Sequence, residues 1–128
     1  MRIELDGRSA LVTGSTRGIG RAIAQALSEC GARVAIVGRD VARAREVAAE
    51  IGGGAEGFGC DLSDLAQVQE MVERVENVFG AVDILVNNAG LTRDNLVVRL
   101  RDSDWDEVLD TNLRAAFGTI RAVARGMM

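Results

Sequence analysis

The sequence predicts an α/β fold of the Rossmann type, a three-layer α/β/α arrangement around a parallel sheet of about four strands. Three observations support this prediction. Short apolar runs of strand length alternate with segments whose apolar residues recur every three or four positions. The strand-like runs are apolar almost throughout, which is typical of parallel strands that helices cover on both faces. A turn rich in glycine connects the first strand to the first helix.

The alternation divides the chain into four strand–helix pairs. Right-handed crossovers, with a switch point after the third strand, predict the strand order 3-2-1-4 and a ligand crevice at the carboxyl ends of strands 1 and 4. The third strand is short and weakly patterned, so we place it at a sheet edge. The expected strands are 9–13, 33–37, 56–60 and 82–86, and the expected helices are 18–30, 41–51, a third from its cap at Ser63 or Asp64 to Phe79, and a fourth from a capping box of Ser103 and Asp106 to Ala124.

Each of these helices has an apolar face that the spacing defines. In the first helix this face consists of Ile19, Ile23, Ala26, Leu27 and Cys30. In the last helix it consists of Trp105, Val108, Leu109, Leu113, Phe117, Ile120 and Ala124.

Length and composition narrow the class of protein. The 128 residues are expected to form a single domain, 1–128. A net charge of −4 argues against a nucleic-acid partner, and the absence of a run of 18 apolar residues argues against a membrane span. The first residues lack the long apolar region of a secretory signal, so we expect a cytoplasmic protein. Cys30 and Cys60 are expected to be reduced core residues, and without histidine or a cysteine cluster we expect no metal site.

The glycine-rich turn is the strongest candidate for a ligand site. Free backbone N–H groups and the positive end of a helix dipole converge there, which favours an anion such as the diphosphate of a dinucleotide. Gly14 would permit the tight turn, Gly18 would let the backbone approach the phosphates, and Gly20 would let the helix pack closely on the strand. A plain strand–loop–helix connection is the alternative. The expected cofactor-binding residues of this turn are Gly14, Ser15, Thr16, Arg17, Gly18, Ile19 and Gly20.

The spacing of these glycines, G-x-x-x-G-x-G after a threonine, resembles the signature of the short-chain dehydrogenase/reductase family. Two other stretches fit the resemblance. Asp61, followed by Leu62, occupies the place of the aspartate that holds the adenine amino group in the family. Asn112 matches the helix asparagine of the family's Asn-Ser-Tyr-Lys tetrad. On the residues alone, Asp61 could instead cap a helix, and Asn112 could be a buried polar residue bonded to the backbone.

The sequence after the fourth strand extends the resemblance. Asn87, Asn88, Ala89 and Gly90 match the family's Asn-Asn-Ala-Gly motif, in which the asparagine braces the sheet and Ala-Gly lets the cofactor ribose approach. Their alternative is an ordinary turn. The stretch from Leu91 through Trp105 to Met128 closely resembles bacterial 3-oxoacyl-acyl-carrier-protein reductases. That branch implies an NADPH-dependent role in fatty acid biosynthesis.

Charge at the end of the second strand indicates which dinucleotide is bound. An acidic residue there would bond the ribose 2′-OH of NAD and repel a 2′-phosphate. The sequence has Gly38 at this position and Arg39 next to it, while Arg17 lies in the glycine turn. Two guanidinium groups suit a phosphate, so we predict NADP(H), with NAD(H) as the alternative. Asp40 weakens the charge argument, and Arg39 could also be a solvated loop residue.

The resemblance stops short of the family's catalytic groups. In the family a serine, a tyrosine and a lysine beyond the next strand perform the reduction, and the sequence has no tyrosine at all. Asn112 would then be the remnant of a tetrad in a half-Rossmann domain without the catalytic carboxyl-terminal half. We therefore expect an NADP(H)-binding module that does not catalyse alone. Two alternatives remain: an oxidoreductase completed by a partner chain or using different chemistry, and a folded fragment that binds no ligand.

The same comparison predicts self-association. In the family a fifth strand pairs with strand 4, so here strand 4 would be an open edge. Apolar side chains on the last helix would lose their neighbour and form an exposed patch. We expect a homo-oligomer through the last helix or the edge of strand 4. The residues expected in the patch are Phe117, Ile120, Val123 and Met127.

Overall fold

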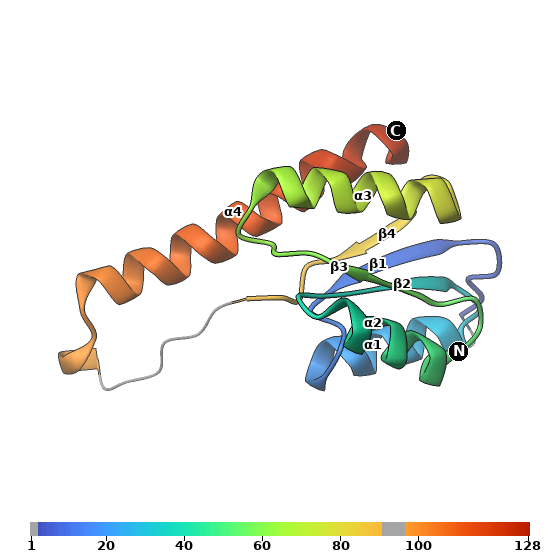
Figure 1. The fold of residues 1–128 in the computed structure, drawn as a ribbon, viewed down its shortest axis with the longest axis horizontal. Coiled ribbons are helices and arrows are strands. Elements are labelled where there is room, and N and C mark those ends of the chain that lie inside the picture. Colours follow the sequence, from blue (N-terminus) through green and yellow to red (C-terminus); the bar gives the residue numbers. More distant parts are fainter. Residues whose placement is uncertain (1–2, 91–96) are drawn as a thin grey trace.

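The computed structural model describes residues 3–90 and 97–128 and contains a four-stranded parallel sheet between two helical layers. Helices α1 and α2 cover one face of the sheet, and α3 and α4 cover the other (Figure 1). Residues 91–96, which contributed to the family resemblance, lie outside the described residues. The elements are β1 (Ser9–Thr13), α1 (Gly18–Glu29), β2 (Arg33–Gly38), α2 (Val41–Ile51), β3 (Glu56–Gly59), α3 (Leu65–Phe79), β4 (Ile84–Val86), the 3-10 helix η1 (Val97–Arg99) and α4 (Asp102–Met127).

The strand order β3-β2-β1-β4 confirms the predicted order 3-2-1-4. All three neighbouring pairs are parallel, and β1, buried along its whole length, lies between β2 and β4. Within the described residues β3 and β4 are the two edge strands. The switch in strand order therefore falls between β1 and β4, where the carboxyl ends of both strands are followed by a loop.

Two apolar cores lie on opposite faces of the sheet, because side chains along a strand alternate between its faces. Leu11 of β1 belongs to the core under α3 and α4, whereas its neighbours Ala10 and Val12 belong to the core under α1 and α2. Cys60 is buried in the first of these cores, as predicted, and Cys30 is half-buried. Both cysteines are free thiols.

Helix α1 turns a partly different face to the sheet than its apolar spacing predicted. Ile19 is 74% exposed and Ala26 is exposed, while Gly20 and Ala24 are buried. The prediction was wrong at these positions because α1 contacts the strands through its smallest residues, which allow a close approach. Ile23 and Leu27 are partly buried against the core, as the spacing predicted.

Helix α4 begins at Asp102, earlier than the predicted capping box of Ser103 and Asp106. The carboxylate of Asp104 accepts the backbone N–H of Arg101 at 3.2 Å and also two guanidinium N–H groups of Arg101. Asp104, and not the predicted Asp106, therefore accepts the backbone N–H at the helix start. At the start of α3, Asp64 is the cap, since it accepts the N–H groups of Ala66 and Gln67.

The apolar stripe predicted on α4 lies mostly in solvent. Its small residues face α3 instead: Ala115, Gly118, Thr119, Ala122 and Val123 are buried. Val123 was therefore wrongly placed in the exposed patch, whereas the exposure of Phe117, Ile120 and Met127 is confirmed. The amino-terminal half of α4 extends beyond the sheet (Figure 1). We call the exposed set the α4 stripe, which consists of Trp105, Leu109, Leu113, Phe117 and Ile120.

No helix in the described ranges is long and apolar enough to cross a membrane. This holds for α4 as well, although it has 26 residues, because charged residues interrupt its apolar positions.

Candidate functional site

The three glycines of the turn between β1 and α1 meet three different geometric requirements. Gly14 has a φ of +61°, and a Cβ atom there would lie 2.9 Å from the Cα atom of Ala89. Gly18 has a φ of +57°, and a Cβ atom there would meet nothing within 4 Å. Gly20 would place a Cβ atom 2.2 Å from the carbonyl oxygen of Gly14. Gly14 and Gly20 thus allow close contacts within the protein, while Gly18 leaves the approach to the helix start open.

Ser15 fixes this turn to the second strand. Its hydroxyl donates to the carbonyl oxygen of Val12 at 2.7 Å and accepts the N–H of Val37 at 2.9 Å. The N–H of Ser15 in turn donates to the carbonyl oxygen of Val37 at 3.2 Å. Because Ser15 is fully buried and these groups are bonded inside the protein, Ser15 holds the turn in place.

The amino terminus of α1 offers an uncompensated positive end. Arg17 is its N-cap residue, no side chain caps the helix, and the first turn holds no acidic residue. The first N–H groups of a helix have no partner within it, so they attract an anion. Arg17 and Arg39 are both exposed, at the end of the turn and just after β2. The groups present therefore fit a phosphate-bearing ligand.

Thr13 connects the loop after β4 to the glycine turn. Its hydroxyl oxygen accepts the N–H groups of Asn88 and Ala89, each at 3.1 Å, and the hydroxyl contacts the carbonyl oxygen of Val86 at 3.4 Å. The side-chain amide of Asn88 donates to the carbonyl oxygen of Gly14 at 3.1 Å. The Asn-Asn-Ala-Gly segment thus lies against the start of the turn at the carboxyl ends of β1 and β4, where the crevice was predicted.

A cavity of about 230 Å³ opens beside this loop. Asn112 reaches it from α4, and a Cβ atom on Gly90 would lie 3.2 Å from the Asn112 side-chain oxygen. Asn87 accepts a hydrogen bond from the hydroxyl of Thr119 at 2.6 Å, which ties α4 to the loop. The lining residues include five that the sequence predicted as site residues: Leu62, Asn88, Ala89, Gly90 and Asn112.

Asp61 lies in the turn between β3 and α3. One of its carboxylate oxygens, Oδ1, accepts the hydroxyl of Ser63 at 2.7 Å and the N–H of Ser63 at 3.0 Å. These hydrogen bonds, helped by the positive charge of Arg39, lower the pKa of Asp61 below its usual value. The carboxylate is therefore ionised at neutral pH and keeps its acceptor capacity. Because Asp64 caps α3, the alternative of a helix cap does not account for Asp61.

The sequence did not single out two residues that organise this site, Thr13 and Thr119. Both are buried, and their hydroxyls hold the loop that follows β4. The sequence signals for these residues were a threonine at the end of an otherwise apolar strand and another threonine on the small-residue face of α4. Neither signal specifies a bonding partner, because the partners are more than 30 residues away.

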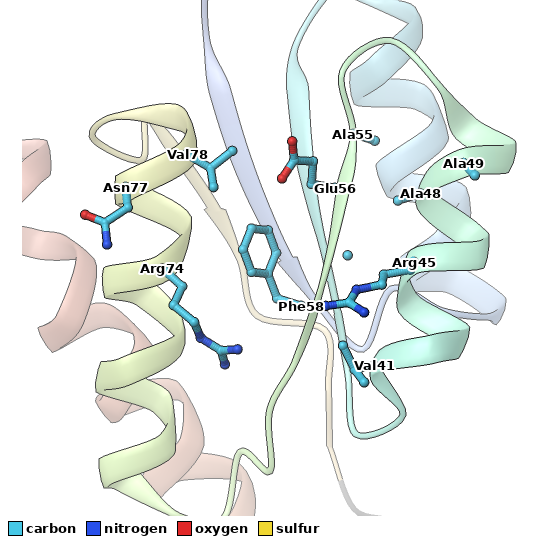
Figure 2. A pocket seen from close by; sticks show the side chains of 11 residues that line it. Val41, Arg45, Ala48, Ala49, Ala55, Glu56, Phe58, Arg74, Asn77 and Val78 are labelled. Carbon is cyan, nitrogen blue, oxygen red and sulfur yellow. The ribbon is translucent and has the colours of Figure 1, made fainter.

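A larger cavity of about 610 Å³ lies elsewhere, at the outer edge of β3 between α2 and α3 (Figure 2). Arg45 and Arg74 approach it from the two helices, and Phe58 lies between them. Arg74 donates to the carbonyl oxygen of Gly59 at 2.9 Å. None of the predicted site residues lines this cavity. Across the described ranges, no group of three histidine, cysteine, aspartate or glutamate side chains is placed to hold a metal ion.

Known proteins resemble this chain over nearly its whole length. It is 41% identical over 126 residues to the 3-oxoacyl-acyl-carrier-protein reductase FabG of Escherichia coli, which covers 98% of this chain and 52% of that protein. Nodulation protein G of a Rhizobium species is 46% identical over 125 residues, with 98% of this chain and 51% of the relative covered. The chain spans about half the length of the curated relatives it matches.

Solved structures give the same result. A short chain dehydrogenase/reductase family protein superposes with a TM-score of 0.86 at 39% identity, covering 98% of this chain and 52% of its own. A metagenomic short-chain oxidoreductase solved in complex with NADP superposes with a TM-score of 0.84 at 40% identity, covering 96% and 57%. The family profile described as short chain dehydrogenase matches residues 8–128. The chain therefore belongs to the short-chain dehydrogenase family.

Proposed function

We propose that this chain binds NADP(H) and that its 128 residues do not perform the family's carbonyl reduction by themselves. The observation that carries the binding proposal is the uncapped start of α1, which is open at Gly18 and has Arg17 as its N-cap residue. Arg39 follows Gly38, whose Cα lies close to Thr16 of the same turn. A diphosphate suits the helix start, and a 2′-phosphate suits the two guanidinium groups. The relative solved with NADP and the family's reductases support this assignment.

Each end of the dinucleotide has a set of residues suited to it. The backbone from Thr16 to Gly20 would hold the diphosphate, and Arg17 and Arg39 would hold the 2′-phosphate. Asp61, beside Leu62, would accept the adenine amino group, because an ionised carboxylate offers only acceptors. Asn88, Ala89, Gly90 and Asn112 would form the wall near the nicotinamide ribose, where the bound cofactor would supply a hydride.

The catalytic part of the proposal depends on residue types that the chain lacks. The family reaction, as the resemblance implies, needs a tyrosine to donate a proton and a lysine to lower its pKa. The sequence contains no tyrosine, histidine or lysine, since all 15 of its basic residues are arginine. The phenol, imidazole and ammonium groups that could serve as such a proton donor are therefore all missing from the sequence. Asn112 can position groups but cannot donate the required proton.

Titration with NADPH and with NADH, by calorimetry, tests the binding proposal. We expect saturable binding that prefers NADPH. The double variant Arg17→Ala/Arg39→Ala should weaken NADPH binding by roughly 10-fold or more and NADH binding much less, because hydrogen bonds to charged groups are worth about 1.5–3 kcal/mol. Arg45→Ala, which removes an exposed arginine at the β3 edge, is the matched control. Equal losses for both dinucleotides would refute the role of the arginines.

The titration, together with an assay for reduction of a 3-oxoacyl thioester, has three further outcomes that separate the alternatives. No binding at millimolar cofactor would favour a folded fragment without a ligand. Binding without reduction of a 3-oxoacyl thioester would support the proposal as stated. Reduction that appears only when a second polypeptide is added would favour an oxidoreductase completed by a partner chain.

We also propose that the chain self-associates through the α4 stripe. These five residues are spaced three or four apart and are between 39% and 66% exposed, which makes one continuous apolar surface. The open edge of β4 is the second candidate surface, since its outer N–H and C=O groups have no neighbouring strand within the described residues.

A further inference from the structure

The carboxyl end of β2 is where dinucleotide-binding folds place the residue that reads the adenosine ribose. In this chain that residue is Gly38. The φ angle of Gly38 is not positive, so its backbone lies outside the left-handed region. The backbone conformation therefore does not require a glycine here. Something else about the site must select it.

The space above Gly38 is taken by Thr16. A Cβ atom on Gly38 would lie 2.7 Å from the Cγ2 methyl of Thr16 and 3.6 Å from its Oγ1 atom. Carbon atoms do not approach to 2.7 Å without a shift of one of them. A threonine carries two heavy branches on Cβ, so only one of its three staggered rotamers would turn the hydrogen toward Gly38. Thr16 could therefore avoid a Cβ atom at position 38 in only one other rotamer, and leaving its preferred rotamer costs energy.

The backbone of Thr16 cannot easily withdraw either. The preceding residue, Ser15, is fully buried and bonded to Val37 through both its N–H, at 3.2 Å, and its hydroxyl, at 2.9 Å. Val37 is the neighbour of Gly38 in β2. The turn and the end of the strand are therefore joined one residue before the contact between Thr16 and Gly38.

We propose that Thr16 is a specificity-determining residue that acts through position 38. Its methyl group occupies the space that an acidic side chain at the end of β2 would need, which keeps a carboxylate away from the ribose and leaves that region to Arg17 and Arg39. The contact thereby confines position 38 to a residue without a side chain, so the site lacks the carboxylate that would bind a free 2′-hydroxyl and repel a 2′-phosphate. This inference rests on the proposed function for its ligand, but the steric contact itself does not.

The first test measures stability and uses no cofactor. Gly38→Ala is made in three backgrounds: the natural Thr16, Thr16→Ser, which lacks the methyl, and Thr16→Val, which keeps both branches. Gly38→Ala should lower the melting temperature with Thr16 and with Thr16→Val, and the loss should be at least halved with Thr16→Ser. Non-additivity of this kind is the sign of a direct contact. An equal loss in all three backgrounds would overturn the steric part of the proposal.

The second test measures the dissociation constants of NADH and NADPH for Gly38→Asp in the same backgrounds. Thr16→Ser/Gly38→Asp should bind NADH at least 10-fold more tightly than Thr16→Val/Gly38→Asp, and both should bind NADPH more weakly than the natural chain. Equal NADH affinity in the two double variants would overturn the specificity role. Failure of the natural chain to bind either dinucleotide would refute the proposed function and the specificity role with it, while the melting temperatures would still decide the contact.

Discussion

Hydroxyl side chains make the internal hydrogen bonds that shape the turn after β1. Thr13 holds two backbone N–H groups of the loop after β4, and Ser15 joins the turn to β2. Both side chains are buried, so water does not replace a bond that is lost. The positions of the loop and of the turn therefore depend on these two residues.

Thr13→Val tests this dependence. The substitution keeps the shape of the side chain but leaves the N–H groups of Asn88 and Ala89 without their acceptor. We expect the free energy of unfolding to fall by roughly 1–3 kcal/mol, measured by urea denaturation. Thr13→Ser, which keeps the hydroxyl, should lose clearly less. If both variants lost the same amount, the cost would lie in packing and not in the hydrogen bonds.

Cys60 gives the chain a dependence on alkaline pH. Burial raises the pKa of its thiol from 9.0 to about 11. In the unfolded chain the thiol ionises near its ordinary pKa, so the stability that Cys60 contributes is complete below pH 9 and is lost as the pH rises toward 11. Cys60→Ala should flatten the fall in unfolding free energy across this window, as measured by urea denaturation at several pH values. Cys30→Ala, which removes the other, half-buried thiol, is the matched control.

Sequence patterns predicted which segments lie close together at the carboxyl ends of β1 and β4. They did not predict in which direction each side chain there points. The glycine turn, the Asn-Asn-Ala-Gly loop and Asn112 lie where the pattern placed them, because parallel strands bring their carboxyl ends to one edge. Ser15 is different: its hydroxyl faces the protein interior. A turn motif specifies backbone conformation, and a side chain's direction depends on neighbours such as Val37 that are distant in sequence.

Among the elements, α4 shows how residue size decides which face is buried. A Cβ atom on Gly118 would lie 2.7 Å from the Cδ2 atom of Leu65 at the start of α3. The two helices therefore approach closely where α4 has no side chain. Larger apolar residues such as Leu113 and Phe117 lie on the exposed side.

Gly118→Val should separate the two helices. The added branches would overlap Leu65, and overpacking of this kind costs about 1–3 kcal/mol. The free energy of unfolding should fall by that amount, and limited proteolysis should cleave near α4 more rapidly. Arg114→Val, at an exposed position of α4 outside the α4 stripe, should change the stability by no more than about 0.5 kcal/mol. Equal stability of Gly118→Val and the natural chain would show that the helices do not pack as described.

The pattern of apolar residues predicted α4 itself but not its start or its buried face. The helix begins at Asp102 because Asp104 reaches back to the N–H of Arg101, and more than one acidic residue in this segment could have played that part. The stripe containing Trp105 and Leu113 has the apolar spacing from which α4 was predicted, yet it is exposed. Periodicity identifies an apolar face, but only the packing partner decides whether that face is covered.

For the whole molecule, the strand order could be predicted because connections of the β-α-β type have one handedness. The first two crossovers lead the chain outward from β1 to β2 and then to β3. The third crossover returns it to the other side of β1, where β4 pairs. The two apolar cores then follow from alternation along the strands. The residues of the exposed surface on α4 could not be predicted in the same way. Spacing alone does not show that Val123 packs into the core while the larger residues around it stay exposed.

The exposed α4 stripe predicts a dimer or larger assembly at tens of micromolar chain, measured by sedimentation velocity. Burying five large apolar side chains in a second copy would remove them from water, and charge placed at such an interface is unfavourable. Leu113→Glu/Phe117→Glu should therefore raise the dissociation constant by roughly 10-fold or more. Both residues are more than half exposed, so the fold should tolerate the change.

Val78→Glu supplies the control for this experiment, because Val78 is a 41% exposed apolar residue on α3 outside the stripe. It should leave the assembly unchanged. A monomeric natural chain would contradict self-association altogether. An assembly that survives Leu113→Glu/Phe117→Glu would exclude the stripe and point to the edge of β4. A peptide with the sequence of β4, N-methylated on one edge only so that its other edge keeps its N–H groups, should then compete with the second copy for the open strand.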